Sequence, residues 1–198
     1  FVSYTYATNQ IVSDENKDKV GLFNRPSDRQ MTQEYKDLLS KEVTQTRENC
    51  DVLIAMMHWG NEFTYDISTQ QKEVSQLLSD LGVDIIIGNH SHCPQPMEWI
   101  NNNKTLCMYS LGNFVSADPI VDRTNQEFKN AYNVSTMVSL DIVQNDNQIS
   151  IQNIDYTPII NYYDQNLEHF QLIPYDQYTS EYETTHYHYH NGLTKEWI

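Results

Sequence analysis

The chain has 198 residues, enough for one domain with a buried core, and its hydrophobic content of 39% indicates a folded protein rather than a disordered one. Its formal net charge of −15 argues against nucleic-acid binding, because phosphate contacts need clustered Lys and Arg side chains. The acidity itself is explained by the solubility that a charged surface confers. No apolar run approaches the length of about 18 residues that a transmembrane helix needs.

The three cysteines, Cys50, Cys93 and Cys107, are an odd number at irregular spacing, without a Cys-x-x-Cys motif. The sequence therefore predicts buried thiols rather than a disulfide framework. A thiolate metal ligand at Cys93, next to His92, is the alternative. The chain opens with Phe-Val-Ser-Tyr, without an initiating Met or a signal peptide, and we expect it to be part of a longer protein.

The first part of the chain predicts strands separated by two helices. Residues 1–8 alternate as in a strand, and the polar residues 9–31 indicate a loop. Residues 32–48 predict a helix capped by Thr32, with one apolar face formed by Tyr35, Leu38, Leu39 and Val43. Residues 51–60 are an apolar strand with His58 near its end. Residues 68–82 predict a second helix, with a capping box of Ser68 and Gln71, a final Gly82, and a stripe of Val74, Leu77, Leu78 and Leu81.

The second part of the chain predicts strands. Residues 84–87 indicate a buried strand and 105–114 another, whereas 135–143 and 148–160 alternate with period two around a turn at 145–147, which predicts an antiparallel hairpin. Residues 161–198 are polar and rich in tyrosine, and no secondary structure is predicted for them. The order indicates an α/β (mixed α+β) fold, a sandwich rather than a doubly wound parallel sheet. We expect 1–160 to form one domain and 161–198 an extension that packs on it or trails from it.

Three histidines follow the two central strands. His58 ends one strand and His90 follows the next, and a helical crossover between them predicts parallel neighbours whose carboxyl ends lie together. In extended chain, His90 and His92 point to the same face. Neutral imidazoles are ligands for Zn²⁺, Mn²⁺ or Fe²⁺, so we predict a metal site of His58, His90 and His92. A satisfied polar or surface side chain is the alternative for any one of them.

Two carboxylates are candidates for the same site. Glu62 lies four residues after His58, and Glu98 six after His92. Each could hold an imidazole in one tautomer or act as a general acid or base, and a solvated loop carboxylate is the alternative for both. Asp66 is interpreted as solvated.

The tail carries His186, His188 and His190 in alternation with tyrosines. A strand there could present all three histidines on one side for metal binding, but a polar terminal segment is the preferred interpretation.

The motifs HWGNE at 58–62, GNHSHCPQPME at 88–98 and YSLGNF at 109–114 together resemble the capsule-synthesis CapA/PgsA family, which is named for poly-γ-glutamate production and belongs to the calcineurin-like metallophosphoesterases. The resemblance is strong over about 50–115 and implies part of an αββα sandwich. It implies that His58 and His90 ligate one metal and His92 another. Glu62 and Glu98 are family motif positions to which the resemblance assigns no role, and together with His90 they are our candidate catalytic residues. For Trp59 and Asn113 it leaves a role at the site and simple packing or turn formation open.

The aspartates and the asparagine that the superfamily uses in earlier motifs are absent from this sequence. We therefore expect the chain to begin after them and to hold only the histidine part of the site. Three neutral ligands without a bridging carboxylate should bind metal weakly. The expectation is two divalent ions (Mn, Zn or Fe) in the full-length protein, weak or no binding in this chain, and no catalysis by it alone.

The resemblance implies a component of capsule or poly-γ-glutamate synthesis at the outer face of the bacterial membrane, held there by an N-terminal anchor absent from this sequence. The expected partners are the capsule polymer or its precursor and other synthase subunits. A metal-dependent hydrolase is one expectation for the full-length protein. A non-catalytic scaffold subunit of the synthase complex is the alternative.

Overall fold

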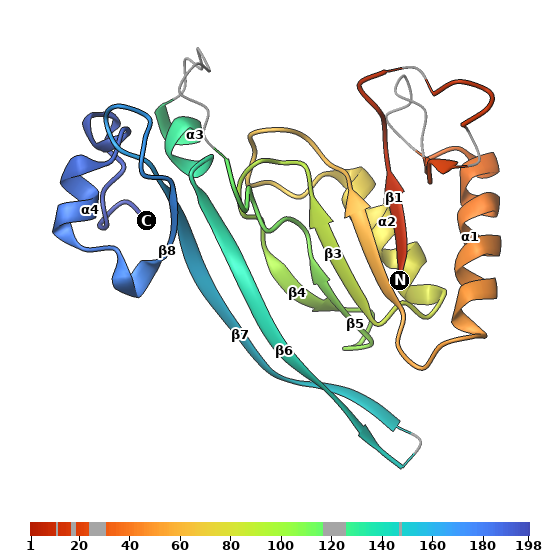
Figure 1. The fold of residues 1–198 in the computed structure, drawn as a ribbon. Helices are drawn as coiled ribbons and strands as arrows, with labels where there is room; N and C mark the ends of the chain where they lie inside the picture. The colour runs from red at the N-terminus through yellow and green to blue at the C-terminus, as the bar shows by residue number, and fades with distance from the viewer. Residues whose placement is uncertain (11, 17–18, 24–30, 117–125, 147) are drawn as a thin grey trace. The chain divides into compact units, whose positions relative to one another are not determined.

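The computed structural model describes residues 1–10, 12–16, 19–23, 31–116, 126–146 and 148–198 (Figure 1). The chain folds into two compact units. The first unit comprises Phe1–Asn61, Asp66–His90 and Gln95–Ser110, and the second comprises Glu62–Tyr65, Ser91–Pro94 and Leu111–Ile198.

The first unit is built on a five-stranded sheet with the order β1-β2-β3-β5-β4. Strands β1, β2, β3 and β5 are parallel, and β4 pairs with β5 in the antiparallel sense. The crossovers from β1 to β2 and from β2 to β3 each contain one helix, as parallel neighbours require. The bounds are β1 Val2–Thr5, β2 Ile54–His58, β3 Ile85–Asn89, β4 Met97–Ile100 and β5 Thr105–Met108.

The two helices of this unit are α1, Gln33–Arg47, and α2, Thr69–Asp80, and both predictions are confirmed. Thr32 caps α1 by accepting a hydrogen bond from the Tyr35 backbone N–H. At α2 both hydrogen bonds of the Ser68–Gln71 capping box form. Leu38, expected on the apolar face of α1, is 47% exposed, because it borders a groove that α1 and β1 line.

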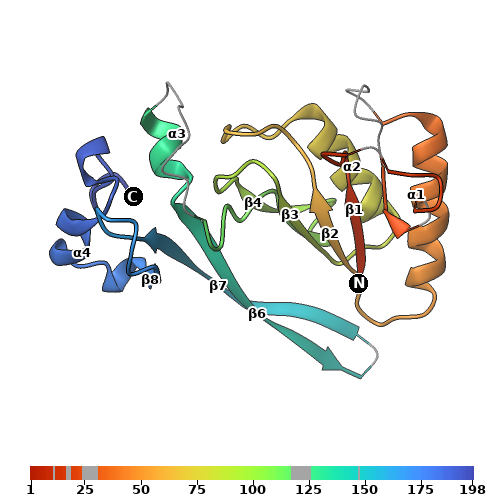
Figure 2. The same ribbon diagram turned by 45° about the horizontal axis from the view of Figure 1, so that its top comes forward.

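Both helices cover one face of the sheet (Figures 1 and 2), and this face forms the main core. Along β2, Ala55 and Met57 are buried, whereas Met56 is 47% exposed. The alternation directs residues 55 and 57 toward the helices and Ile54, Met56 and His58 toward the other face. The core residues that the helices contribute are Leu39, Val43, Val74 and Leu78.

The second unit contains a long antiparallel hairpin of β6, Val134–Asn145, and β7, Gln148–Tyr162. The predicted hairpin is therefore confirmed, and residue 147 of its turn lies outside the described residues. The register shifts once, between Ser139 and Asp141, opposite Asn153, which has a φ of 50°. Strand β8, Gln171–Pro174, pairs with the last residues of β7, from Ile159 to Tyr162.

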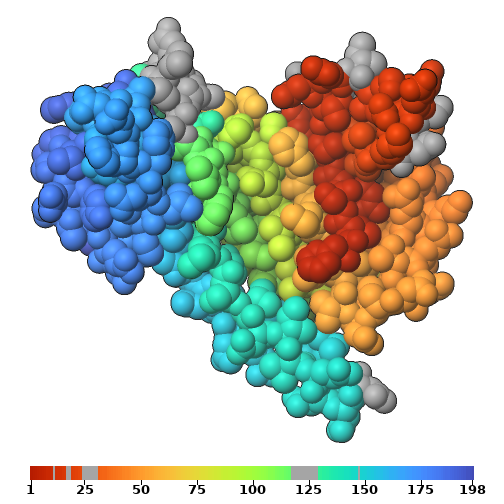
Figure 3. Space-filling view, in the orientation of Figure 1, coloured from red at the N-terminus to blue at the C-terminus, as the bar shows by residue number. Residues whose placement is uncertain are grey.

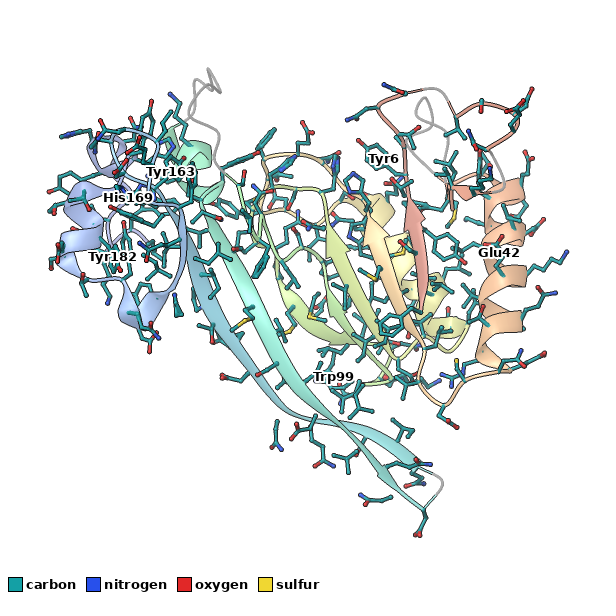
Figure 4. The ribbon with its side chains drawn as sticks, in the orientation of Figure 1. Tyr6, Glu42, Trp99, Tyr163, His169 and Tyr182 are labelled. Carbon is teal, nitrogen blue, oxygen red and sulfur yellow. The ribbon has the colours of Figure 1, made fainter. Side chains whose placement is uncertain are left out.

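Residues 161–198 form ordered structure that the sequence did not predict. They contain the end of β7, β8, the 3₁₀ turns η2 (Tyr175–Gln177) and η3 (Tyr189–Asn191), and helix α4 (Ser180–Thr185). Tyr163 and Tyr178 are fully buried, and Tyr182 packs edge-on against Tyr162 (Figure 4). The stability of this segment therefore depends on burial of aromatic rings, which produces no simple periodicity in the sequence.

The tail histidines do not share a strand face. His186 and His188 are buried, whereas His190 is exposed on η3. The backbone N–H of His188 donates to His186 Nδ1 at 2.9 Å, and His186 Nε2 lies 2.9 Å from the Asn161 carbonyl.

The mixed α/β class is confirmed by the five-stranded sheet with its helices and by the antiparallel sheet of the second unit. Strand β4 and helix α3, Gln126–Ala131, were not predicted, and β5 is shorter than expected, ending at Met108. Among the described residues, no helix combines the length and the apolar character that crossing a membrane requires.

Candidate metal centre

His58 and His90 lie side by side in the first unit, at the carboxyl ends of β2 and β3. The two strands are parallel neighbours, as the crossover predicted, and their register pairs His58 with Asn89. The ring centroids of His58 and His90 are 4.5 Å apart. Tyr6, which follows β1, places its ring 4.8 Å from His90 and 6.0 Å from His58 (Figure 4). Two imidazoles and a phenol thus meet at one end of the sheet.

The backbone at His90 has an unusual conformation. Its φ is 111°, a region that side-chain-bearing residues rarely adopt, and the Asn89 side chain stabilises it by accepting a hydrogen bond from the His90 backbone N–H at 2.9 Å. His90 is only 8% exposed, whereas His58 is exposed. Such strained conformations persist only where the surrounding structure enforces them, and they cluster at functional sites.

His92 belongs to the second unit, where its imidazole contacts two aromatic rings whose centroids are 6.4 Å from each other. The Phe63 ring stacks on it at 5.2 Å and the Tyr132 ring at 5.3 Å. His92 Nε2 lies 3.8 Å from a carboxylate oxygen of Glu62. The Phe63 N–H donates to the Ser91 carbonyl at 2.8 Å, so this bond ties the Glu62 segment to the histidine segment.

Asn113 contacts His92 at two places. Its Oδ1 lies 2.8 Å from His92 Nδ1, and its Nδ2 donates to the His92 carbonyl at 3.2 Å. The same Nδ2 also donates to the Tyr132 carbonyl at 3.2 Å. The sequence predicted a rim or turn role for Asn113 but gave no indication of these contacts.

Each unit therefore supplies two potential ligand groups: His58 and His90 in the first, and His92 and Glu62 in the second. Imidazole nitrogens and a carboxylate oxygen are the donor set that Zn²⁺, Mn²⁺ and Fe²⁺ accept in proteins. The chemistry of these side chains therefore fits a divalent cation.

Glu98 lies elsewhere on the sheet of the first unit. It is an exposed residue of β4, and its carboxylate accepts a hydrogen bond from the Tyr109 hydroxyl at 3.1 Å. The register pairs Glu98 with Cys107, which pairs with Ile86, four residues before His90. Four strand residues correspond to about 13 Å, so Glu98 lies about that far from His90 along the strand direction. The contact of Glu98 is structural, and a catalytic role for it stays a prediction.

Cys93 and Asp66 have contacts of their own. The Cys93 thiol is buried and donates to the Thr64 carbonyl at 3.3 Å, and burial raises the pKa of this thiol above its usual value. These contacts fit a packed thiol better than a thiolate ligand. Asp66 is exposed, and its carbonyl accepts a hydrogen bond from the Gln95 side chain at 3.0 Å.

The motif residues also have a packing role that the sequence did not indicate. The Trp59 indole N–H donates to the Tyr109 carbonyl at 2.9 Å in a fully buried position. A Cβ at Gly88 would lie 2.1 Å from that carbonyl oxygen and 2.4 Å from Trp59 Nε1. Gln71 and Gln95 form a buried amide pair at 2.8 Å. Several motif residues therefore hold the histidine-bearing strands together.

A second group of potential ligands lies on an exposed loop of the second unit. Asp164, Glu168 and His169 each offer a ligand atom within 4.8 Å of the others. Hydrogen bonds from the Glu168 backbone and from His169 lower the pKa of Asp164, and the bond to Asp164 raises the pKa of His169. This group was not predicted from the sequence, although the close spacing of its three residues in the chain was the available signal.

Fold and side chains together define a mixed α/β protein with imidazole side chains at the carboxyl ends of parallel strands. Comparison with known families is consistent with this class. The family model described as "Bacterial capsule synthesis protein PGA_cap" matches residues 1–118, more than half of the chain, and the chain belongs to this family.

Curated relatives carry related names. The "PGA biosynthesis protein CapA" of Bacillus subtilis is 37% identical over 73 residues, which cover 37% of this chain and 19% of the relative. The "Capsule biosynthesis protein CapA" of Bacillus anthracis is 32% identical over 83 residues, which cover 40% of this chain and 20% of the relative. A "Probable polyglutamine synthesis accessory protein" of Mycobacterium tuberculosis is 29% identical over 96 residues, which cover 48% of this chain and 24% of the relative. The matched stretch thus spans about a fifth to a quarter of these relatives.

Proposed function

We propose that this chain is part of a capsule or poly-γ-glutamate synthesis protein and carries the histidine part of a divalent-metal site. The observation that carries the proposal is the pair His58 and His90 in a chain of the PGA_cap family. Their ring centroids lie 4.5 Å apart at the ends of two parallel strands. Relatives named for capsule and polyglutamate synthesis support the biological process.

The residues that would hold the metal are His58 and His90 for one ion and His92 for another, with Glu62 beside His92 as a further oxygen donor. A bound divalent ion would lower the pKa of a coordinated water and polarise a phosphoryl or carbonyl oxygen, so the full-length protein would be a metal-dependent hydrolase. The Tyr6 ring and the strained His90 backbone hold the first pair of ligands in place. The Phe63 and Tyr132 rings hold His92.

The substrate class that fits this process is the capsule polymer or its precursor, at the outer face of the cell membrane and together with other synthase subunits. The chain has a net charge of −15 and would repel a polyanion such as polyglutamate. Divalent ions at the histidines would supply local positive charge where the polymer approaches. The acidic surface therefore makes the proposed metal more important for polymer binding.

The test is a calorimetric titration of the full-length protein with Mn²⁺ and with Zn²⁺, in a His169→Ala background that removes the exposed second group of ligands. We expect His58→Ala and His90→Ala each to weaken binding about tenfold or more, because each removes a ligand. His190→Ala is the matched control, since His190 is an exposed histidine outside both groups. Binding that is equally tight in all four proteins would contradict the proposal.

A scaffold subunit without catalysis is the second candidate, and one observation favours it. Glu98, a candidate catalytic carboxylate, contacts Tyr109 within the sheet, and Tyr109 in turn lies 3.4 Å from the Ser75 hydroxyl. In a scaffold, capsule production in cells should survive the double variant His58→Ala and His92→Ala of the full-length protein. In a metal hydrolase, the same variant should abolish it.

A further inference from the structure

We propose that Asn113 is a positioning residue that fixes the tautomer of His92, with the proton on Nδ1, so that Nε2 is the nitrogen that ligates a cation. The use of Nε2 as a ligand rests on the proposed function. The tautomer itself rests only on the hydrogen bonds of the second unit.

The orientation of the Asn113 amide follows from its neighbours. One end of the amide faces two backbone carbonyl oxygens, those of His92 and Tyr132, each at 3.2 Å. Carbonyl oxygens only accept hydrogen bonds, so the amide nitrogen must be the atom that faces them. A flipped amide would place its oxygen against two other oxygens and would lose both hydrogen bonds.

The tautomer of His92 then follows from the amide. With Nδ2 engaged by the two carbonyls, Oδ1 is the Asn113 atom that lies 2.8 Å from His92 Nδ1. An amide oxygen can only accept, so Nδ1 must carry the proton and donate it. In the neutral ring, Nε2 then holds the lone pair that a metal requires. Nε2 is also the nitrogen that faces Glu62, at 3.8 Å.

Asn113 is itself held firmly enough to impose this choice. The Asn161 side chain donates to the Asn113 carbonyl at 2.9 Å, and the preceding Gly112, with a φ of 79°, forms a bridge to Ser135 on β6. Because Asn113 bonds both the ring and the backbone carbonyl of His92, it fixes the residue at two points. Stacking by Phe63 and Tyr132 sets the plane of the His92 imidazole. The hydrogen bond between His92 Nδ1 and Asn113 Oδ1 leaves Nε2 as the nitrogen that points away from Asn113.

The direct test is long-range ¹H–¹⁵N NMR of the metal-free chain at a pH where His92 is neutral, with His92→Gln used to assign the signals. We expect a protonated Nδ1 and an unprotonated Nε2 in the wild type. Asn113→Leu should produce a mixture of tautomers, because it removes the acceptor at nearly the same volume. Asn113→Asp keeps an acceptor and should keep the wild-type tautomer. Asn166→Leu is the matched control, because it makes the same substitution at an exposed asparagine of the second unit.

A wild-type His92 with its proton on Nε2 would overturn the inference, whether or not the variants fold. An unchanged tautomer in a folded Asn113→Leu protein would also overturn it. The metal titration is a separate measurement: Asn113→Leu should weaken Mn²⁺ or Zn²⁺ binding about 10–100-fold, as loss of a partner that orients a ligand does, and Asn113→Asp should weaken it less. If the wild-type chain shows the expected tautomer but the full-length protein binds neither ion, the positioning role stands and the proposed metal site is wrong.

Discussion

Gly88→Ala should be among the most destabilising single substitutions in the first unit. Gly88 lies on β3, two residues before His90, and pairs in register with Met57. An added Cβ would lie 2.1 Å from the Tyr109 carbonyl oxygen and 2.4 Å from Trp59 Nε1, both buried and hydrogen-bonded to each other. The strand or the indole must therefore move.

The size of the effect follows from two costs. Forcing a methyl group into a packed interior costs about 1–3 kcal/mol. Breaking the Trp59–Tyr109 hydrogen bond and leaving its donor buried costs about 1–3 kcal/mol more. Together they predict a loss of about 4 kcal/mol in the free energy of unfolding.

Urea denaturation followed by circular dichroism measures this loss, and the chain provides a matched control. At Gly192, φ is 82° and the nearest heavy atom to an added Cβ is 3.9 Å away, so Gly192→Ala tests backbone strain without a clash. We expect that control to cost about 1–2 kcal/mol. If Gly88→Ala is no more destabilising than Gly192→Ala, the close approach of β3, Trp59 and Tyr109 is wrong.

Three further predictions concern pH, a buried amide pair and catalysis. Burial lowers the pKa of His186 to about 4, so between pH 6.5 and 4 this imidazole is protonated in the unfolded chain but neutral in the folded chain. The free energy of unfolding should therefore fall by about 3 kcal/mol as the pH drops from about 6.5 to 4. His186→Gln should remove this part of the pH dependence in parallel urea titrations. Gln95→Leu should cost about 1–3 kcal/mol in the same assay, because it removes the 2.8 Å hydrogen bond of the buried Gln71 Nε2 and leaves that nitrogen a longer contact, 3.5 Å, with the Tyr109 carbonyl; the double variant with Gln71→Leu should cost less than the sum of the single variants. The 198-residue chain should show no metal-dependent phosphodiesterase turnover with a chromogenic diester and added Mn²⁺; sustained turnover that a chelator abolishes would show that the histidine part suffices.

The elements with strong local signals were predictable from the sequence. Helix α2 has a capping box, an apolar stripe and a terminal glycine, and each acts within a few residues of its own position. The hairpin of β6 and β7 follows from alternation around a short turn. The proximity of His58 and His90 was also predictable, because one helical crossover fixes the direction of the two strands that carry them.

The remaining features depend on contacts between distant residues. Strand β4 has four residues and owes its existence to pairing with β5. The C-terminal segment is stabilised by buried rings such as Tyr163, which contacts the rings of His186 and His188 more than 20 residues further along the chain. Asn113 and His92 are 21 residues apart, and the direction of an amide relative to an imidazole leaves no periodic trace in the sequence.

The long hairpin of the second unit has a consequence for amide hydrogen exchange. Strand β8 pairs with β7 only from Ile159 to Tyr162, so among the described residues the outer part of the hairpin is a ribbon of two strands. Figure 3 shows its outer part, coloured teal, exposed to solvent on the visible face. In such a ribbon every second N–H points away from the partner strand. Deuterium uptake should therefore alternate from one residue to the next along the outer ribbon. It should lose that alternation at Asn153, where β7 has one residue more than β6, and become slow throughout the paired segment beside β8.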